Sequence, residues 1–215
     1  MQKVLILGGN GYIGSRLRQV LREHHFVKSN DICWHAYDEI SDRRDYHKLT
    51  KQELSEFEVI VVLAGHSSVP SCNGALPGPW LNNVTNFTDL LAKTTDQLII
   101  YASSASVYGN SKPGERHKET NTHFTPVNNY DVTKYALDQQ AIIANLQGRQ
   151  VIGLRFGTVN GYSPNLRVDV MINSMYHSVQ NGTGVQVMNP QISRAMLGIE
   201  DLCRAVLRCK IGRAH

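Results

Sequence analysis

Cysteine is scarce in this sequence, and the four cysteines, at positions 33, 72, 203 and 209, form neither a zinc-type pair nor a disulfide-rich pattern. We therefore interpret them as structural or incidental residues of a reducing compartment and expect no metal site. Long hydrophobic runs are also missing, since none approaches the ~20 residues that cross a bilayer. A strand-like segment starts almost at residue 1, where a signal peptide would lie. These absences predict a cytoplasmic protein without membrane association.

Charge is sparse and scattered, with 22 Lys and Arg against 18 Asp and Glu and a net charge of +4 without a basic block. This pattern argues against a nucleic-acid partner. With 41% hydrophobic residues, 19% charged residues and only 7 prolines, the composition also excludes a disordered or fibrous chain. Its 215 residues suffice for one well-cored domain, or for one domain with a fragment of a second.

Short apolar runs rich in branched residues recur along the chain, separated by longer helix-like segments. The runs are "VLIL" (4–7), "VIVVLA" (59–64), "LIIYAS" (98–103) and "VIGLRF" (151–156). Residues 15–25, 81–94 and 130–146 have apolar residues at every third or fourth position, which is typical of amphipathic helices. Strands that are apolar on both faces and alternate with helices predict a doubly wound, Rossmann-like α/β fold with a parallel sheet.

The pattern changes after residue 156, where "GTVNGYSPNLR" is loop-like, residues 168–182 predict a helix, "VQVM" (185–188) a short strand and residues 200–210 a last helix. We divide the chain into a Rossmann-like domain over 1–160 and a partial, smaller C-terminal region over 161–209 that is interleaved with the last Rossmann elements. The final "KIGRAH" matches no structural expectation and is similar to translated adapter sequence. We therefore expect a truncated chain with a non-native tail at 210–215.

"GGNGYIG" (8–14) lies between the first apolar run and the first helix, and four of its seven residues are glycine. Strand, glycine-rich turn and helix is the context in which such a turn binds a dinucleotide. The glycines fit the required spacing twice, as Gly8, Gly11, Gly14 and as Gly9, Gly11, Gly14. One glycine permits the tight turn, one admits the pyrophosphate to the backbone, and Gly14 allows close packing of the helix. The pyrophosphate then lies at the helix N-terminus, where N–H groups favour negative charge.

An acidic residue follows the turn at the expected distance. Asp31 comes 20 residues after Gly11, at the end of the predicted second strand "HFVKSND". A carboxylate there accepts hydrogen bonds from both ribose hydroxyls of NAD and repels the extra phosphate of NADP, so the sequence favours NAD as the cofactor. Asp38 is the alternative if the strand is instead "CWHAYD", and the neighbouring Asn30 leaves the strand end open.

Three polar residues carry acid–base chemistry. Tyr130 and Lys134 are four residues apart in "NNYDVTKYAL", so both side chains lie on one face of the predicted helix. A tyrosine is a poor base until positive charge stabilises its phenolate, and Lys134 supplies that charge. Ser104 in "YASSASVYG" follows an apolar strand and projects from the carboxyl edge of the sheet, where its hydroxyl donates to a substrate oxygen. Taken alone, Tyr130 and Lys134 are more simply interpreted as a solvated pair on a helix face. Ser104, like Ser103 and Ser106, is more simply interpreted as a cap of the loop.

Together these motifs resemble the extended short-chain dehydrogenase/reductases, the NAD-dependent epimerase/dehydratase family that acts on nucleotide sugars. The resemblance runs from residue 2 to about residue 208 and rests on motifs in the family's order. These are "GGNGYIG", Asp31, "SDRRDYHKL", "VIVVLAGHSSV", "NNV", "YASSASVYG", "YDVTK", "VIGLRFGTVNG" and "SRAMLGIEDLCRAV". Their agreement is specific for the superfamily and less specific for the reaction.

The resemblance implies a full set of site residues. Those implied at the cofactor are Gly8, Gly11, Tyr12, Ile13, Gly14, Asp31, Asp42, Ala64, Gly65, Asn83 and Lys134. Within this set Asp42 would hold the adenine amino group, and Asn83 and Lys134 would lie at the nicotinamide ribose. The residues implied at the substrate are Ser104, Thr158 and Arg194. A planar guanidinium such as that of Arg194 binds phosphate through two hydrogen bonds, although a surface arginine is the simpler interpretation.

Departures from the family pattern bear on the reaction. Dehydratases of the family carry an acidic pair just after the catalytic hydroxyl, and this chain has Ala105 and Ser106 there, so dehydration is disfavoured. Many sugar epimerases have Asn where this chain has Thr158, which leaves the sugar open.

The resemblance implies an enzyme, and our leading hypothesis is an epimerase of a nucleotide sugar that uses tightly held NAD, with Tyr130 as acid and base and residues 161–209 at the substrate. A NAD-dependent dehydrogenase or reductase of the same fold is the nearest alternative, and a non-catalytic NAD-binding sensor is the third. Family members often dimerise through a four-helix contact that includes the Tyr130 helix. We therefore expect a homodimer of the full-length protein.

Overall fold

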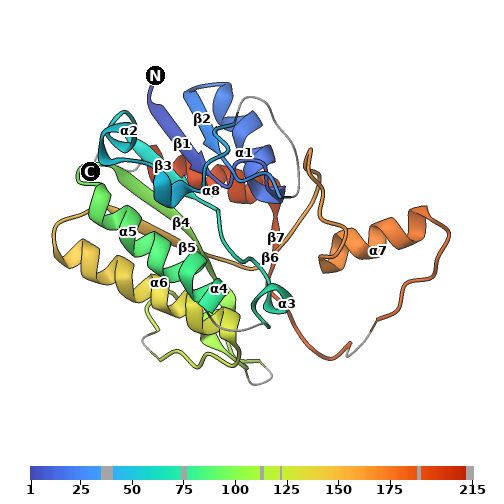
Figure 1. The fold of residues 1–215 in the computed structure, drawn as a ribbon. Coiled ribbons are helices and arrows are strands. Elements are labelled where there is room, and N and C mark those ends of the chain that lie inside the picture. The colour runs from blue at the N-terminus through green and yellow to red at the C-terminus, as the bar shows by residue number, and fades with distance from the viewer. Residues whose placement is uncertain (35–40, 74–76, 112–113, 122, 188–189, 212–215) are drawn as a thin grey trace.

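The fold is described from a computed structural model, which covers residues 1–34, 41–73, 77–111, 114–121, 123–187 and 190–211 (Figure 1). Its centre is a parallel sheet of five strands in the order β2-β1-β3-β4-β5. The strands are β1 (Lys3–Leu7), β2 (Phe26–Asn30), β3 (Val59–Val62), β4 (Leu98–Ser104) and β5 (Val151–Phe156). The order reverses between β1 and β3, as in doubly wound folds. The predicted Rossmann-like α/β class is therefore confirmed.

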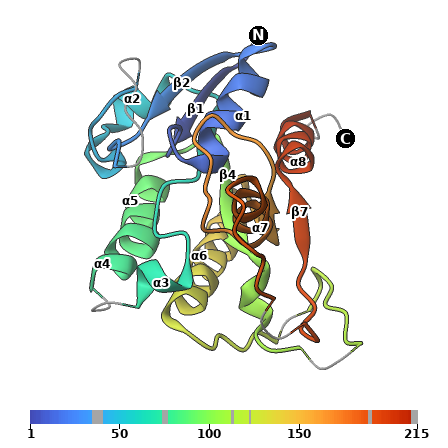
Figure 2. The same cartoon turned by 90° about the vertical axis from the view of Figure 1, so that its right-hand side faces the viewer.

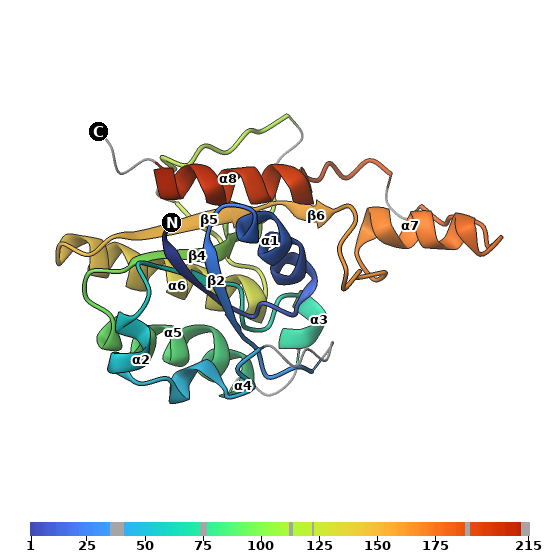
Figure 3. The same ribbon diagram turned by 90° about the horizontal axis from the view of Figure 1, so that it is seen from above.

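Helices cover both faces of the sheet. Helices α1 (Tyr12–Arg22) and α8 (Ile199–Ile211) lie on one face, and α2 (Lys51–Ser55), α5 (Asn86–Lys93) and α6 (Asn129–Leu146) lie on the other (Figure 3). Figure 2 views the sheet with α8 on its right and α5 on its left. Val4 and Ile6 of β1 pack toward α1 and α8, whereas Leu5 and Leu7 pack toward the opposite helices. Because both faces are covered, the strands are continuous apolar runs.

Short helical turns connect these elements. They are η1 (Tyr46–Lys48), α3 (Val69–Cys72), α4 (Pro77–Trp80), the π-helical η2 (Leu81–Thr85) and η3 (Ala105–Tyr108). The predicted helix over 81–94 is thus η2 followed directly by α5. Its π-helical first part widens the backbone at residues 82 and 83, which lie beside the loop after β3.

The C-terminal region adds a second, two-stranded sheet of β6 (Thr158–Asn160) and β7 (Met196–Gly198), with α7 (Met171–Gln180) between them in sequence. Helix α7 stands apart from the main sheet in Figure 1. The strand predicted at 185–188 is wrong for 185–187, which are irregular, and residue 188 lies outside the described ranges. Val185 and Val187 are exposed, so their alternation buries no face. Of the predicted tail, residues 210 and 211 continue α8, and 212–215 are not described.

Candidate active site

The glycine turn connects β1 to α1 where the strand order reverses. Gly8 has a left-handed φ of +84°, and a Cβ there would lie 2.6 Å from the backbone nitrogen of Ala64. A Cβ on Gly14 would lie 2.1 Å from the carbonyl oxygen of Gly8, because the helix packs directly on the turn. Gly11, the N-cap of α1, has room for a side chain. The atom nearest to a Cβ at this position would be the carbonyl oxygen of Gly8, at 3.4 Å. Gly8 and Gly14 therefore serve the turn and the packing, while Gly11 offers bare backbone at the helix N-terminus.

Tyr12 begins α1, and its side chain reaches the C-terminal region. The ring is buried, and its hydroxyl donates to the carbonyl of Gly161 at 2.7 Å and accepts from Asn173 Nδ2 at 3.1 Å. Ile13 packs against the core between the sheet and α8. The cofactor contacts predicted for Tyr12 and Ile13 would therefore be made by their backbone N–H groups, which lie in the first turn of the helix.

The segment 161–167, which we call the crossing segment, runs over the start of α1. Ser163 Oγ donates to the carbonyl of Tyr12 at 2.6 Å, and its hydroxyl lies 2.7 Å from that of Ser15. Asn165 Nδ2 donates to the carbonyl of Asn10 at 2.8 Å. These hydrogen bonds join the C-terminal region to the glycine turn across about 150 residues of sequence.

Asp31 follows β2 directly and lies beside the glycine turn, as predicted. Its Oδ2 accepts from the backbone nitrogen of Asn10 at 2.9 Å, and its Oδ1 accepts from that of Cys33 at 2.7 Å. Each carboxylate oxygen keeps acceptor capacity beyond these bonds, which is what two ribose hydroxyls require. The described β2 ends at Asn30, which favours Asp31 over Asp38, and Asp38 lies outside the described residues.

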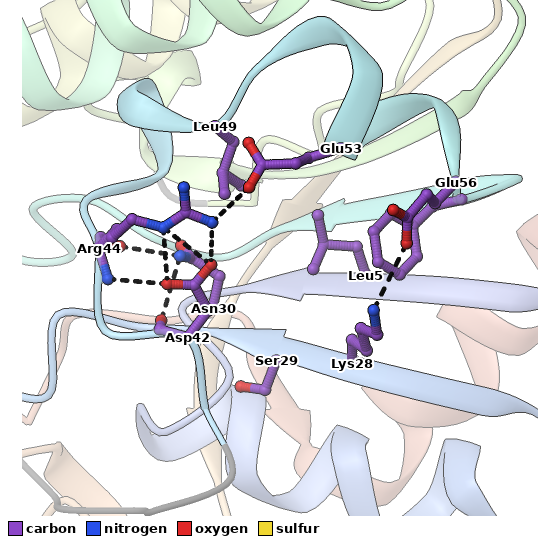
Figure 4. Close-up of a pocket in the computed structure, with 10 residues that line it drawn as sticks. Leu5, Lys28, Ser29, Asn30, Asp42, Arg44, Leu49, Glu53 and Glu56 are labelled. Carbon is purple, nitrogen blue, oxygen red and sulfur yellow. Dashed lines mark hydrogen bonds and ion pairs between the residues drawn. The ribbon is translucent and has the colours of Figure 1, made fainter.

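Asp42 is joined to the end of β2 by its backbone, since its carbonyl accepts from the Asp31 nitrogen at 2.9 Å. Its carboxylate is held by Arg44, with 2.6 Å between Nη2 and Oδ2, and Arg44 also pairs with Glu53 at 2.6 Å. The hydrogen bond from Arg44 lowers the pKa of Asp42. The three side chains border a pocket of about 170 Å³ at the β2 edge of the sheet (Figure 4). An adenine amino group would share this carboxylate with Arg44.

Asn83 fixes the loop after β3 to α6. Its Oδ1 accepts from the backbone nitrogen of His66 at 2.8 Å, and its Nδ2 donates to Thr133 Oγ1 at 3.0 Å. Gly65 leaves room for this amide, because its φ is +136° and a Cβ there would lie 2.4 Å from Asn83 Oδ1. Ala64 is the half-buried residue against which Gly8 packs. Both the Oδ1 and the Nδ2 of Asn83 are therefore already hydrogen-bonded within the protein, so the predicted cofactor contact would have to share them.

Ser104, Tyr130 and Lys134 meet at the carboxyl edge of the sheet. Ser104 ends β4, and its Oγ accepts from the backbone nitrogen of Ser106 at 3.2 Å, so it also caps η3. Tyr130 and Lys134 lie on successive turns of α6, and Lys134 Nζ is 5.8 Å from the centre of the Tyr130 ring. The buried ammonium donates to the carbonyl of Ala102 at 2.8 Å. The Ser104 side chain lies close enough to the Tyr130 hydroxyl to lower its pKa, while the hydrogen bonds of Ser104 Oγ are made with Ser106.

The electrostatics of this group differ from the expectation in one respect. Burial raises the pKa of Tyr130 overall, while the side chain of Ser104 and the charge of Arg167 lower it. Burial also lowers the pKa of Lys134 to about 8. The expected acidification of the phenol by Lys134 is not among the causes of the shift, and desolvation disfavours the charged forms of both groups.

The residues predicted at the substrate are spread more widely. Thr158 is half-buried in β6, two residues beyond Phe156, which pairs with Ser104 in the sheet register. Its backbone nitrogen donates to the carbonyl of Ala195 at 2.8 Å. Arg194 precedes β7 and is exposed, so its guanidinium lies in solvent, whereas Thr158 follows the strand partner of Ser104 by two residues.

Sequence reasoning missed two residues that act on the phenol. Arg167 pairs with Asp169 at 2.5 Å and donates to Ser67 Oγ at 3.1 Å, and its positive charge favours the phenolate of Tyr130. Cys72 on α3 is fully buried, and its thiol acts electrostatically on Tyr130 and Lys134. Both lie in segments without a motif and reach α6 only through the fold.

The chain matches the family model described as "NAD dependent epimerase/dehydratase family" over residues 4–209. It belongs to this family. Protein CapI of Staphylococcus aureus is 28% identical over 235 residues, covering 96% of this chain and 68% of CapI. The ADP-L-glycero-D-manno-heptose-6-epimerase of Pseudomonas aeruginosa PAO1 is 26% identical over 177 residues, covering 74% of this chain. The chain spans about half the length of that relative, 51%.

Among solved structures, the UDP-glucuronic acid 4-epimerase of Bacillus cereus, in complex with UDP-glucuronic acid and NAD, superposes with a TM-score of 0.82 at 21% identity. The superposition covers 95% of this chain and 72% of that chain. The match confirms the predicted family, which is a family of NAD-dependent enzymes, and the superposition agrees with the predicted fold. None of the helices in the described ranges combines the length and apolar character needed to span a membrane.

Proposed function

We propose that this protein is a nucleotide-sugar epimerase in which Tyr130 moves the proton of a sugar hydroxyl that is oxidised to a transient ketone and then reduced. The observation that carries the proposal is the meeting of Ser104, Tyr130 and Lys134 at the carboxyl edge of the parallel sheet, the edge at which β1 also leads into the glycine turn. The names of the relatives agree with it, since they include a heptose 6-epimerase and a glucuronic acid 4-epimerase.

The residues at the sheet edge fit a bound dinucleotide. Gly11 and the first N–H groups of α1 would hold the pyrophosphate, and the two oxygens of Asp31 would accept the adenosine ribose hydroxyls. NAD, when bound, accepts a hydride from the substrate carbon and returns it.

The chain's own residues supply the proton transfers. Tyr130 as phenolate takes the proton of the sugar hydroxyl while the C–H bond breaks and the ketone forms. Ser104, whose side chain acts on the pKa of Tyr130, orients the same oxygen and donates to it as negative charge develops. Lys134 and Arg167 favour the phenolate by their positive charge. The same proton would return from Tyr130 to the oxygen when the ketone is reduced on its opposite face, which would invert the stereocentre.

The substrate class rests on weaker but independent features. Arg194 would bind the diphosphate, and Thr158, two residues beyond the strand partner of Ser104, would contact the sugar. Ala105 and Ser106 follow Ser104 without an acidic side chain, so the site offers no strong proton donor there for expelling water. The relatives' names include ADP and UDP sugars, and the proposal therefore names a nucleotide sugar without its base.

The proposal is tested by incubating the purified protein with NAD and a panel of UDP and ADP sugars, following epimers by NMR and NADH by absorbance. An epimerase inverts a sugar without net NADH. Steady NADH accumulation indicates a dehydrogenase instead, and NAD binding without turnover of any sugar indicates a sensor. Tyr130→Phe should abolish turnover, whereas Tyr135→Phe on the same helix should not, because its ring packs on Phe124 away from the site.

We also propose that the protein forms a homodimer through α5 and α6. Four large apolar side chains of α6 are exposed, and three of them lie in its last turns: Ile142 at 48%, Ile143 at 49% and Leu146 at 83%, with Val132 at 39% near its start. Covering them in a helical contact would remove this surface from water. Ile143→Lys should then give a monomer in sedimentation equilibrium, and a wild-type monomer would contradict the proposal.

A further inference from the structure

A buried acid lies one helical turn beyond Lys134. Asp138 is only 4% exposed, and each of its carboxylate oxygens accepts a hydrogen bond from a different strand. Tyr101 of β4 donates its hydroxyl to Oδ1 at 2.7 Å, and Arg155 of β5 donates Nε to Oδ2 at 2.9 Å. The carboxylate thus joins α6 to two neighbouring strands directly behind the proposed catalytic residues.

The surroundings are shaped to fit this arrangement. Gly153 of β5 makes space for the Tyr101 hydroxyl, since a Cβ there would lie 2.4 Å from that oxygen. Arg155 continues outward, donating Nη1 to the hydroxyl of Tyr108 at 2.9 Å, with its guanidinium carbon 4.7 Å from the centre of the Phe124 ring. The buried ion pair therefore has hydrogen bonds on both sides, which such a pair requires.

The carboxylate also acts on Lys134. Residues four apart share one face of a helix, so Asp138 and Lys134 lie on neighbouring turns toward β4. The groups that face the ammonium are the Ala102 carbonyl of β4, the Cys72 thiol of α3 and, on α6 itself, the Tyr130 ring and Asp138. From β5, the Arg155 guanidinium faces Asp138. Burial lowers the pKa of Lys134, and Cys72 and Asp138 raise it.

We propose that Asp138 is a positioning residue of the active site, which anchors α6 to β4 and β5 and keeps the Lys134 ammonium charged beside Tyr130. Its catalytic consequence rests on the proposed epimerase function, but its effect on the charge of Lys134 does not. A purely structural anchor would not set the titration of Lys134, so the charge role is read from the lysine itself and the anchoring role from a variant that removes one hydrogen bond and keeps the carboxylate.

The test measures the titration of Lys134 directly, by NMR of protein labelled with ¹³C at the lysine ε-carbons, with Lys134→Arg to assign its signal. Asp138→Asn should lower the midpoint by about 0.5 or more on the pH scale, because an opposite charge is lost from a buried site. Asp138→Glu should restore it. Asp89→Asn is the matched control, because it removes an exposed carboxylate paired with Lys93 at 2.6 Å, and should leave the midpoint unchanged. An unchanged midpoint in Asp138→Asn, or an equal shift in Asp89→Asn, overturns the charge role.

Tyr101→Phe tests the anchoring role and serves if Asp138→Asn does not fold. It keeps the charge and removes one hydrogen bond, so kcat should fall about 3- to 10-fold with KM unchanged, as for a small displacement of catalytic groups. An unchanged kcat in folded Tyr101→Phe overturns this role. If the wild type epimerises none of the sugars, the proposed function fails, while the lysine titration still decides the effect of Asp138.

Discussion

The glycine turn permits a sharp prediction, because two of its glycines are required for different reasons. In Gly14→Ala the new methyl would lie 2.1 Å from Gly8 O and 2.8 Å from Gly9 Cα, both backbone atoms that cannot rotate away. Overpacking of this kind costs about 1–3 kcal/mol. For a chain of this size, that cost lowers Tm by roughly 2–12 °C, at about 2–4 °C per kcal/mol.

Gly11→Ala is the matched variant. Its Cβ would approach protein no closer than 3.4 Å, and its φ of −67° and ψ of 175° suit any residue, so stability should change by less than about 1 kcal/mol. The methyl would instead stand where the backbone must approach the pyrophosphate. We expect NAD affinity to fall about tenfold or more, about 1.4 kcal/mol.

Thermal unfolding by circular dichroism and calorimetric titration with NAD separate the two effects. Gly14→Ala should lose stability, and Gly11→Ala should lose affinity while it melts like the wild type. Wild-type affinity in Gly11→Ala would refute the assignment of the turn to the pyrophosphate, and a wild-type Tm in Gly14→Ala would refute the close packing of α1.

Further predictions concern the charged and acid–base residues. Tyr130→Phe should lower kcat by about 10²–10⁴-fold without loss of NAD affinity, as measured by single-turnover kinetics and calorimetry. The pKa of Lys134 is about 8 in the folded state and ordinarily near 10.4, so between these values the unfolded chain binds more protons and stability rises with pH. Urea unfolding should therefore show that, from pH 7 to pH 10.5, the free energy of unfolding of the wild type rises by up to about 3 kcal/mol more than that of Lys134→Met. An equal change in both proteins would contradict the burial of a charged Lys134. Asp31→Ser should shift the NAD/NADP affinity ratio toward NADP, and an unchanged ratio would remove Asp31 from the ribose site. Arg167→Ala should raise the pKa of Tyr130, seen as an alkaline shift of its phenolate absorbance, because a positive charge that favours the phenolate is lost.

Much of the fold is predictable because its signals are local. The apolar runs at 4–7 and 98–103 predict buried parallel strands, and each ends where β1 and β4 deliver the glycine turn and Ser104 to the carboxyl edge. Tyr130 and Lys134 share a helix face by spacing alone. For these residues the local sequence predicts both the secondary-structure element and the face to which the side chain points.

The remaining features depend on contacts between distant segments. Asn83 is held by His66 and by Thr133, 50 residues away, so its double role follows from the packing of η2 against α6. The raised pKa of Tyr130 likewise reflects burial, which no local pattern reports. The strand predicted at 185–188 is wrong because alternation predicts a strand only where a sheet edge receives it.

The hydrogen bonds between the C-terminal region and the start of α1 affect how the protein unfolds and where it can be truncated. Tyr12 lies inside the proposed first domain, yet both partners of its buried hydroxyl come from beyond residue 160. In a fragment that ends at residue 160, the Tyr12 hydroxyl would lose both its hydrogen-bond acceptor and its donor. A buried polar group without partners costs about 1–3 kcal/mol of folding free energy. We therefore expect that the predicted division at residue 160 is not a folding boundary, and that the 215-residue chain unfolds in one cooperative transition.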